Sequence, residues 1–191
     1  MSNLKDIAAT ALDTLGAHQT GAALAISGDP AKAATVRTLL ERVLSHVYAA
    51  HHQGAQQAAE NRELATSDEL RETLRMGVEA NHSQAARLED VFKAFGLSAV
   101  AVPDQAMAGI KADNQAANEE FAADTLALDL TLIESGQVAA HFYIAQYGAM
   151  LSYAQLLRNA DAAALLERTI EETRLVAANF TRLAHKLIVS A

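Results

Sequence analysis

The sequence contains no cysteine and no tryptophan, and only two of its 191 residues are proline. The absence of cysteine excludes disulfides, thiolate metal sites and a cysteine nucleophile, and it is compatible with a reducing compartment. Aromatic residues make up only 5% of the chain, whereas alanine, leucine, glutamate, glutamine and arginine are abundant. Because these abundant residues favour helices, the composition predicts an all-α protein.

Long hydrophobic runs and clusters of positive charge are also missing. No apolar stretch approaches the roughly 20 residues that a membrane-spanning helix needs. The start of the chain, MSNLKDIAAT, lacks the basic start and apolar centre of a signal peptide. The formal net charge is −8, with no basic patch to bind phosphates. We therefore expect a cytoplasmic protein whose partners include neither nucleic acid nor a membrane.

Hydrophobic spacing and capping residues divide the chain into five long helices and one short helix. The expected ranges are 3–26, 30–64, 67–96, a short helix that begins near 103, 121–158 and 161–189. Asp29 followed by Pro30 is a favoured helix start, and Thr66 and Glu69 have the spacing of a capping box. A chain of this length supports one domain with one core. We expect a single domain, residues 1–191, in which residues 1–28 add an N-terminal helix to a bundle of residues 29–191.

The expected helix 121–158 is apolar on opposite sides. Successive helical residues are about 100° apart, so its side chains can be assigned to faces. One apolar stripe contains Leu126, Leu130, Ile133, Gln137, His141, Ile144 and Gly148. The opposite stripe contains Leu128, Leu132, Ala139, Phe142, Met150, Tyr153 and Leu157. Both stripes require cover, which we expect from the bundle and from either the N-terminal helix or a second subunit.

Seven histidines are the first candidates for a functional site. Glu79 and His82 have the Glu-x-x-His spacing of metal-binding bundles, but both lie away from an apolar stripe centred on Asn81, so we expect them to face outward. His51 and His52 are neighbours whose side chains diverge by about 100°. They therefore cannot reach one ion together. We place His51 at the edge of the inward stripe and His52 outside.

His141, Glu134 and Glu172 complete the candidates. His141 lies on an expected inward stripe, and Glu134 lies two turns before it. His141 is either a metal ligand or a buried imidazole hydrogen-bonded to a neighbouring helix, because buried polar groups need partners in any case. Glu172 lies at the flank of the apolar stripe of the last helix.

From about Val43 onward, a series of segments follows the order found in a known family. These segments are VYAAHHQ, DELRETL leading to RLEDVFKAFG, DQAMAGIKAD, HFYIAQYG and LLERTIEETR. With them the chain resembles the YciF-like ferritin-like proteins, a bacterial family associated with stress responses. The resemblance implies a ferritin-like antiparallel four-helix bundle with a short helix between the second and third bundle helices. It also implies a homodimer and a two-metal site of carboxylates and histidines.

Few ligands of that site are present at the matched positions. The residues that stand there are His51, Gly77, Ala140, His141, Glu172, Thr173 and Arg174. His141 and Glu172 are the two that match the family's pattern. Two divalent ions need several anionic oxygens between them. The pattern therefore favours a bundle that has largely lost its two-metal site and acts as a dimeric binding or scaffold protein rather than an enzyme.

Two alternatives stay open. His51, His141 and Glu172, with Glu134 as a weaker fourth ligand, would suit one iron, manganese or zinc ion in an oxidase or peroxide-consuming protein. A pocket for an apolar ligand between the helices is the other alternative. Its walls would be small residues, namely Ala139, Ala140, Ala145, Gly148 and Ala149.

Overall fold

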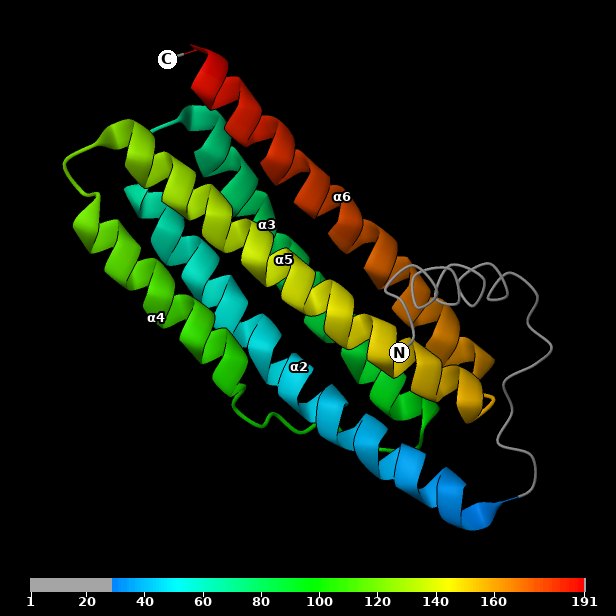
Figure 1. The fold of residues 1–191 in the computed structure, drawn as a ribbon. Coiled ribbons are helices and arrows are strands. Elements are labelled where there is room, and N and C mark those ends of the chain that lie inside the picture. Colours follow the sequence, from blue (N-terminus) through cyan, green and yellow to red (C-terminus); the bar gives the residue numbers. More distant parts are fainter. Residues whose placement is uncertain (1–28, 191) are drawn as a thin grey trace, which may run out of the picture.

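Four long helices form an elongated bundle, and a shorter helix lies along its outside (Figure 1). The computed structural model describes residues 29–190, and within them the only regular elements are helices. They are α2 (Pro30–Leu64), α3 (Asp68–Ala94), α4 (Gln105–Glu120), α5 (Thr125–Leu156) and α6 (Ala160–Ser190). The predicted all-α class is confirmed. The expected N-terminal helix of residues 1–28 lies outside the described residues.

The order of the helices produces a bundle with one long crossover. Short connections make α2 and α3 one antiparallel pair and α5 and α6 another (Figure 1). Between the pairs, α4 returns the chain along the length of the bundle, so that α3 and α5 run in the same direction (Figure 1). A single long crossover of this kind distinguishes ferritin-like bundles from simple up-and-down bundles. The expected short helix in the second connection is therefore present.

The predicted helix boundaries agree with the structure to within a few residues. The Asp29 carboxylate accepts hydrogen bonds from two backbone N–H groups of the first turn of α2, and Pro30 is its first residue. Gly96 ends α3 with a φ of 69°, a conformation that glycine adopts at little cost. One detail was wrong, because Ser67, not Thr66, caps α3.

Thr66 instead takes part in a contact between α3 and α5. The Asp129 carboxylate of α5 accepts hydrogen bonds from the Thr66 N–H (2.7 Å), the Thr66 hydroxyl (2.9 Å) and the Ser67 N–H (2.8 Å). Asp129 is buried, so these three donors offset the loss of its hydration. The negative charge also lies at the N-terminus of α3, where the helix dipole favours it. This contact connects the α2–α3 pair to the α5–α6 pair at one end of the bundle.

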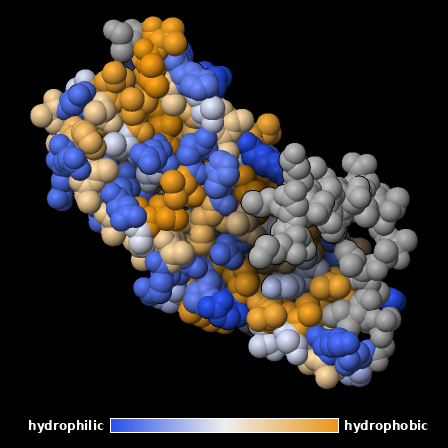
Figure 2. Space-filling view, in the orientation of Figure 1, coloured by the Kyte–Doolittle hydropathy of each residue, from blue (hydrophilic) through white to orange (hydrophobic). Residues whose placement is uncertain are grey.

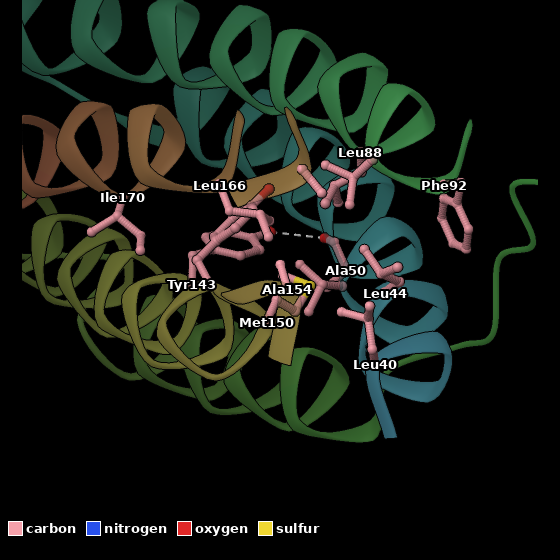
Figure 3. Packing of buried hydrophobic residues seen from close by; sticks show 14 of the residues in the cluster. Leu40, Leu44, Ala50, Leu88, Phe92, Tyr143, Met150, Ala154, Leu166 and Ile170 are labelled. Carbon is pink, nitrogen blue, oxygen red and sulfur yellow. Dashed lines mark hydrogen bonds between the residues drawn. The ribbon is translucent and has the colours of Figure 1, made fainter. Parts of the chain in front are cut away.

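The hydrophobic core consists of two clusters, one towards each end of the bundle. The larger cluster includes Leu40, Leu44, Leu88, Phe92, Met150 and Leu166, which point toward one another from four helices (Figure 3). The smaller cluster consists of Ala65, Leu70, Leu74, Leu128, Leu132, Ile133, Phe180 and Leu183. Polar side chains occupy the middle of the bundle between the clusters.

The crossover helix α4 covers part of the second apolar side of α5. It packs against both α5 and α2, and its Met107 is fully buried in the larger cluster. Amide groups complete the contact, since Gln57 Nε2 of α2 donates to Asn114 Oδ1 of α4 at 3.2 Å and to Ser135 Oγ of α5 at 2.8 Å. The sequence prediction had assigned this role to the N-terminal helix or a second subunit and had overlooked α4.

Within residues 29–190, no helix combines the length and the apolar character that crossing a bilayer demands.

Candidate functional site

A buried imidazole lies in the polar layer between the two core clusters. His51 of α2 is fully buried. Its Nδ1 lies 2.9 Å from Asn81 Oδ1 of α3, and its Nε2 lies 2.7 Å from the Tyr147 hydroxyl of α5. The ring stacks on Tyr143, with centroids 4.2 Å apart. The Tyr143 hydroxyl in turn donates to the backbone carbonyl of Ala50 at 2.9 Å (Figure 3). This network joins three helices of the bundle.

The hydrogen-bond pattern determines which nitrogen of His51 carries the hydrogen. The Asn81 amide group donates to the Gly77 carbonyl at 2.8 Å, so the Asn81 oxygen faces His51 as an acceptor. Nδ1 of His51 therefore donates to Asn81, and Nε2 accepts the hydrogen bond from Tyr147. Both nitrogens have partners while the ring is neutral.

Burial keeps the groups of this network uncharged. It lowers the pKa of His51 to about 4 from an ordinary value of 6.5, because the low-dielectric interior disfavours the charged imidazolium. Burial likewise raises the pKa of the Tyr143 and Tyr147 hydroxyls. A proton-transfer catalyst that works near pH 7 needs a pKa close to that pH. His51 has the properties of a structural imidazole.

A cavity of about 80 Å³ lies beside the network and extends to all four bundle helices. Its lining includes small residues, namely Gly54, Ala58, Gly77, Ala80, Gly136, Ala139, Ala140 and Thr173. Polar but uncharged side chains also line it, namely Gln57, Asn61, Asn81, Gln84, Ser135 and Tyr143. Among the described residues that line this space, none carries a charge.

Two glycines in the lining permit close approach of aromatic side chains. A Cβ on Gly54 would lie 2.5 Å from the Tyr143 hydroxyl oxygen, and a Cβ on Gly136 would lie 2.4 Å from the Phe180 ring. Any larger residue at either position would displace an aromatic ring. Of the small residues that the sequence predicted around a pocket, Ala139 and Ala140 line the cavity, whereas Ala145 is exposed.

The structure places His141 on the surface of α5, so the predicted inward orientation was wrong. Its Nδ1 lies 2.9 Å from the Gln137 carbonyl of the same helix, and Glu134 is exposed as well. The inward face is rotated by one residue and contains Ala140, Tyr143 and Tyr147. Because α5 is apolar almost all round, hydrophobic spacing alone could not determine which face is buried.

Glu172 is neutralised by an arginine that lies deeper in the bundle. Arg87 of α3 forms two parallel hydrogen bonds with its carboxylate, at 2.7 and 3.0 Å, and a third with the Thr169 hydroxyl at 2.7 Å. Arg168 contacts the same carboxylate at 2.9 Å from the surface. The hydrogen bonds from Arg87 lower the pKa of Glu172. Both carboxylate oxygens therefore already have cationic partners.

The predicted metal ligands do not form one site. His51 is buried in the neutral network, Glu172 pairs with Arg87, and His141 and Glu134 face outward. In residues 29–190, no three histidine, aspartate or glutamate side chains form a group that could hold a metal ion.

The matched ligand positions that do reach the cavity supply no anionic oxygen. They are Gly77, Ala140 and Thr173. A pair of divalent ions requires several carboxylates. The donors present around the cavity therefore do not fit the two-metal site that the family resemblance implies.

Sequence reasoning missed Tyr143 and Tyr147, the α5 members of the buried network. It correctly placed Glu79 and His82 on the outside, and it placed Asn81 at the centre of the inward stripe of α3. An asparagine at an expected inward position was the available signal, because an amide that faces the interior requires hydrogen-bonding partners from the facing helices.

We expect His51 to reduce stability as the pH falls. In the unfolded chain the His51 imidazole binds a proton below about pH 6.5, whereas in the folded chain it does so only near pH 4. The free energy of unfolding therefore decreases between these values, by about 2 kcal/mol from pH 7 to pH 5. Urea unfolding at both pH values should show that His51→Gln lacks this decrease. The exposed control His52→Gln should keep the decrease in the free energy of unfolding. An unchanged decrease in His51→Gln would show that the His51 imidazole is not its source.

The two arginines that contact Glu172 should differ in their contribution to stability. Replacing Arg87 leaves a partly buried carboxylate without its bidentate partner, so Arg87→Gln should lower the free energy of unfolding by about 2 kcal/mol. Arg168 has a side chain that is 70% exposed, and Arg168→Gln should cost less than about 0.5 kcal/mol. Denaturant unfolding of both variants measures the difference in the free energy of unfolding. Equal losses of stability would show that the burial of Arg87 does not strengthen its contact with Glu172.

Comparison with known proteins identifies the relatives of this chain. The family described as "Domain of unknown function (DUF892)" matches residues 35–191. Protein YciF of Escherichia coli (strain K12) is 28% identical over 153 residues, which are 78% of this chain and 90% of YciF. The crystal structure of the E. coli stress protein YciF matches with a TM-score of 0.75 at 24% identity, covering 82% of this chain and 98% of that one. YcfI from Rhodopseudomonas palustris matches with a TM-score of 0.74 at 26% identity, covering 76% and 92% of the two chains. The chain therefore belongs to the DUF892 family and is a YciF-like protein.

Proposed function

We propose that this chain is a dimeric binding or scaffold protein of the YciF type, associated with stress, whose bundle holds no two-metal centre. The observation that carries the proposal is the absence of charge in the lining of the central cavity and in the network around His51. His51, Tyr143 and Tyr147 are neutral, and the Glu172 carboxylate, a predicted ligand, is bound to Arg87. A redox centre of hard cations requires anionic oxygens instead.

The names of two relatives support the association with stress and a structural role. The E. coli relative is called a stress protein, and a structural role is suggested for the R. palustris relative. Both relatives align along most of their length with this chain. We transfer both associations to this chain as part of the proposal.

A single-metal oxidase that uses His51, His141 and Glu172 is the competing proposal. It requires three side chains to meet at one ion. His141 faces away from the bundle interior, and the Glu172 carboxylate is occupied by two arginines. Binding of a metal there would require α5 to rotate and the Arg87 contact to break. The geometry therefore supports the binding or scaffold function better.

Metal content and iron oxidation test the first part of the proposal. Protein purified without a chelator should contain far less than one iron, manganese or zinc ion per chain by mass spectrometry of the elements. Ferrous iron added in air should be oxidised no faster than in buffer, because residues 29–190 contain no group of three histidine, aspartate or glutamate side chains that could bind it. A ferritin assayed in parallel is the positive control. One ion per chain that is lost in His141→Ala would support the competing proposal instead.

Exposed hydrophobic side chains support the dimer. Leu175 is 72% exposed and Val189 is 86% exposed on α6. Figure 2 shows hydrophobic residues gathered at the end of the molecule where α6 terminates. Contacts between identical subunits commonly bury such residues.

Light scattering coupled to size-exclusion chromatography measures the oligomeric state directly. We expect a species of about 41 kDa, twice the 20.3 kDa mass of one chain. The hydrophobic association should persist when the salt concentration is raised, since screening weakens charge pairs and not apolar contacts. A mass of one chain across the micromolar range would contradict the dimer and leave the metal result unaffected.

A further inference from the structure

We propose that the central cavity is a binding site for a small neutral molecule that combines a short apolar body with one amide or alcohol group. The site is the space beside Asn81 and Tyr143 in the middle of the bundle. The inference does not depend on the dimer or on the association with stress. It rests on the shape, the charge and the hydrogen-bonding groups of the lining.

The walls of the cavity favour an apolar body. Leu74 and Phe180 belong to the smaller core cluster and form one end. Val176 and Ala139 add further apolar surface. A ligand that covers these side chains removes apolar surface from water, which is favourable in proportion to the area buried.

Two buried amide side chains give the site its polar character. Asn61 is only 5% exposed and lines the cavity, yet its side chain makes no hydrogen bond within residues 29–190. Gln84 is 6% exposed, and its Nε2 donates to Thr173 at 3.4 Å, while its Oε1 accepts no hydrogen bond in the same part of the chain. Buried polar groups are normally paired. The cavity therefore presents both a free donor and free acceptors.

The absence of charge in the lining selects a neutral ligand. An ion in this space would lose its hydration without gaining an opposite charge, which is strongly unfavourable. A group that both donates and accepts, as amides and alcohols do, can pair with the donor and the acceptor of one amide side chain, either Asn61 or Gln84. A carboxylate of the same shape only accepts, and it carries a charge.

The size of the cavity limits the ligand to a few atoms. A volume of about 80 Å³ is about half that of an engineered apolar cavity of about 150 Å³ that binds benzene. Molecules smaller than benzene, of about four or five non-hydrogen atoms, correspond to this volume. At that size, affinities in the millimolar range are expected, since binding free energy is limited per atom.

Propanamide is the probe, and propanoate is its charged analogue of the same shape. Nuclear magnetic resonance of the full chain, with labelled methyl groups, follows the signals of Leu74 and Val176 during titration. We expect saturable shifts with propanamide, with a dissociation constant below about 10 mM. We expect no saturation with propanoate at the same concentrations.

Substitutions at Gly77 and Asn61, with a matched control at Gly109, locate the site. A Cβ on Gly77 would meet only the Ala58 side chain at 3.8 Å, and a Cβ on Gly109 of α4 would meet nothing within 4 Å. Gly77→Leu should therefore fill cavity space and weaken propanamide binding at least about tenfold, whereas the matched control Gly109→Leu should not change it. Asn61→Leu should weaken binding about fivefold by removing the free amide. Gly77→Ala provides a smaller change in the same direction.

Several outcomes would overturn the proposal. Shifts that rise linearly with concentration would show that propanamide does not occupy a defined site. Equal binding of propanoate would contradict the neutral lining, and unchanged binding in Gly77→Leu or Asn61→Leu would place the ligand elsewhere. A cavity that holds only water would give no saturable shift. Metal content and oligomeric mass are separate measurements, so this proposal can fail while the proposed function holds.

Discussion

The hydrogen bonds that a buried imidazole requires control the middle of this bundle. His51 is fully buried, and it brings two ring nitrogens into the interior of the bundle. Asn81 and Tyr147 supply the partners, and their positions fix the relative rotation of α2, α3 and α5. Hydrophobic contacts alone tolerate small rotations, whereas hydrogen bonds of 2.7 to 2.9 Å do not.

Most of the fold could be predicted from the sequence, because the signals that define it are local. Asp29 before Pro30 and the glycine at residue 96 mark helix ends through chemistry that involves only neighbouring residues. The orientation of α5 could not be predicted. Its apolar residues surround the helix, and the partners that select one face, α4 and the His51 network, are distant in sequence.

The site was predicted in part, and the errors have one physical origin. His51 was identified as an inward residue, and it is. His141 was placed on an inward stripe and Glu172 at the flank of one, and both match the family's pattern, but neither side chain points into the cavity. In each case the adjacent position, Ala140 or Thr173, reaches the cavity instead. A helix turns by about 100° per residue, so an error of one position removes a residue from the interior.

The pair between Arg87 and Glu172 has a consequence for how the protein assembles in the cell. The arginine brings its positive charge as part of the chain, so the carboxylate is neutralised as soon as α3 and α6 meet. A metalloprotein must instead wait for an ion from its surroundings before such charges are balanced. The contact between α3 and α6 at this point therefore needs no added ion, because both of its charges belong to the chain.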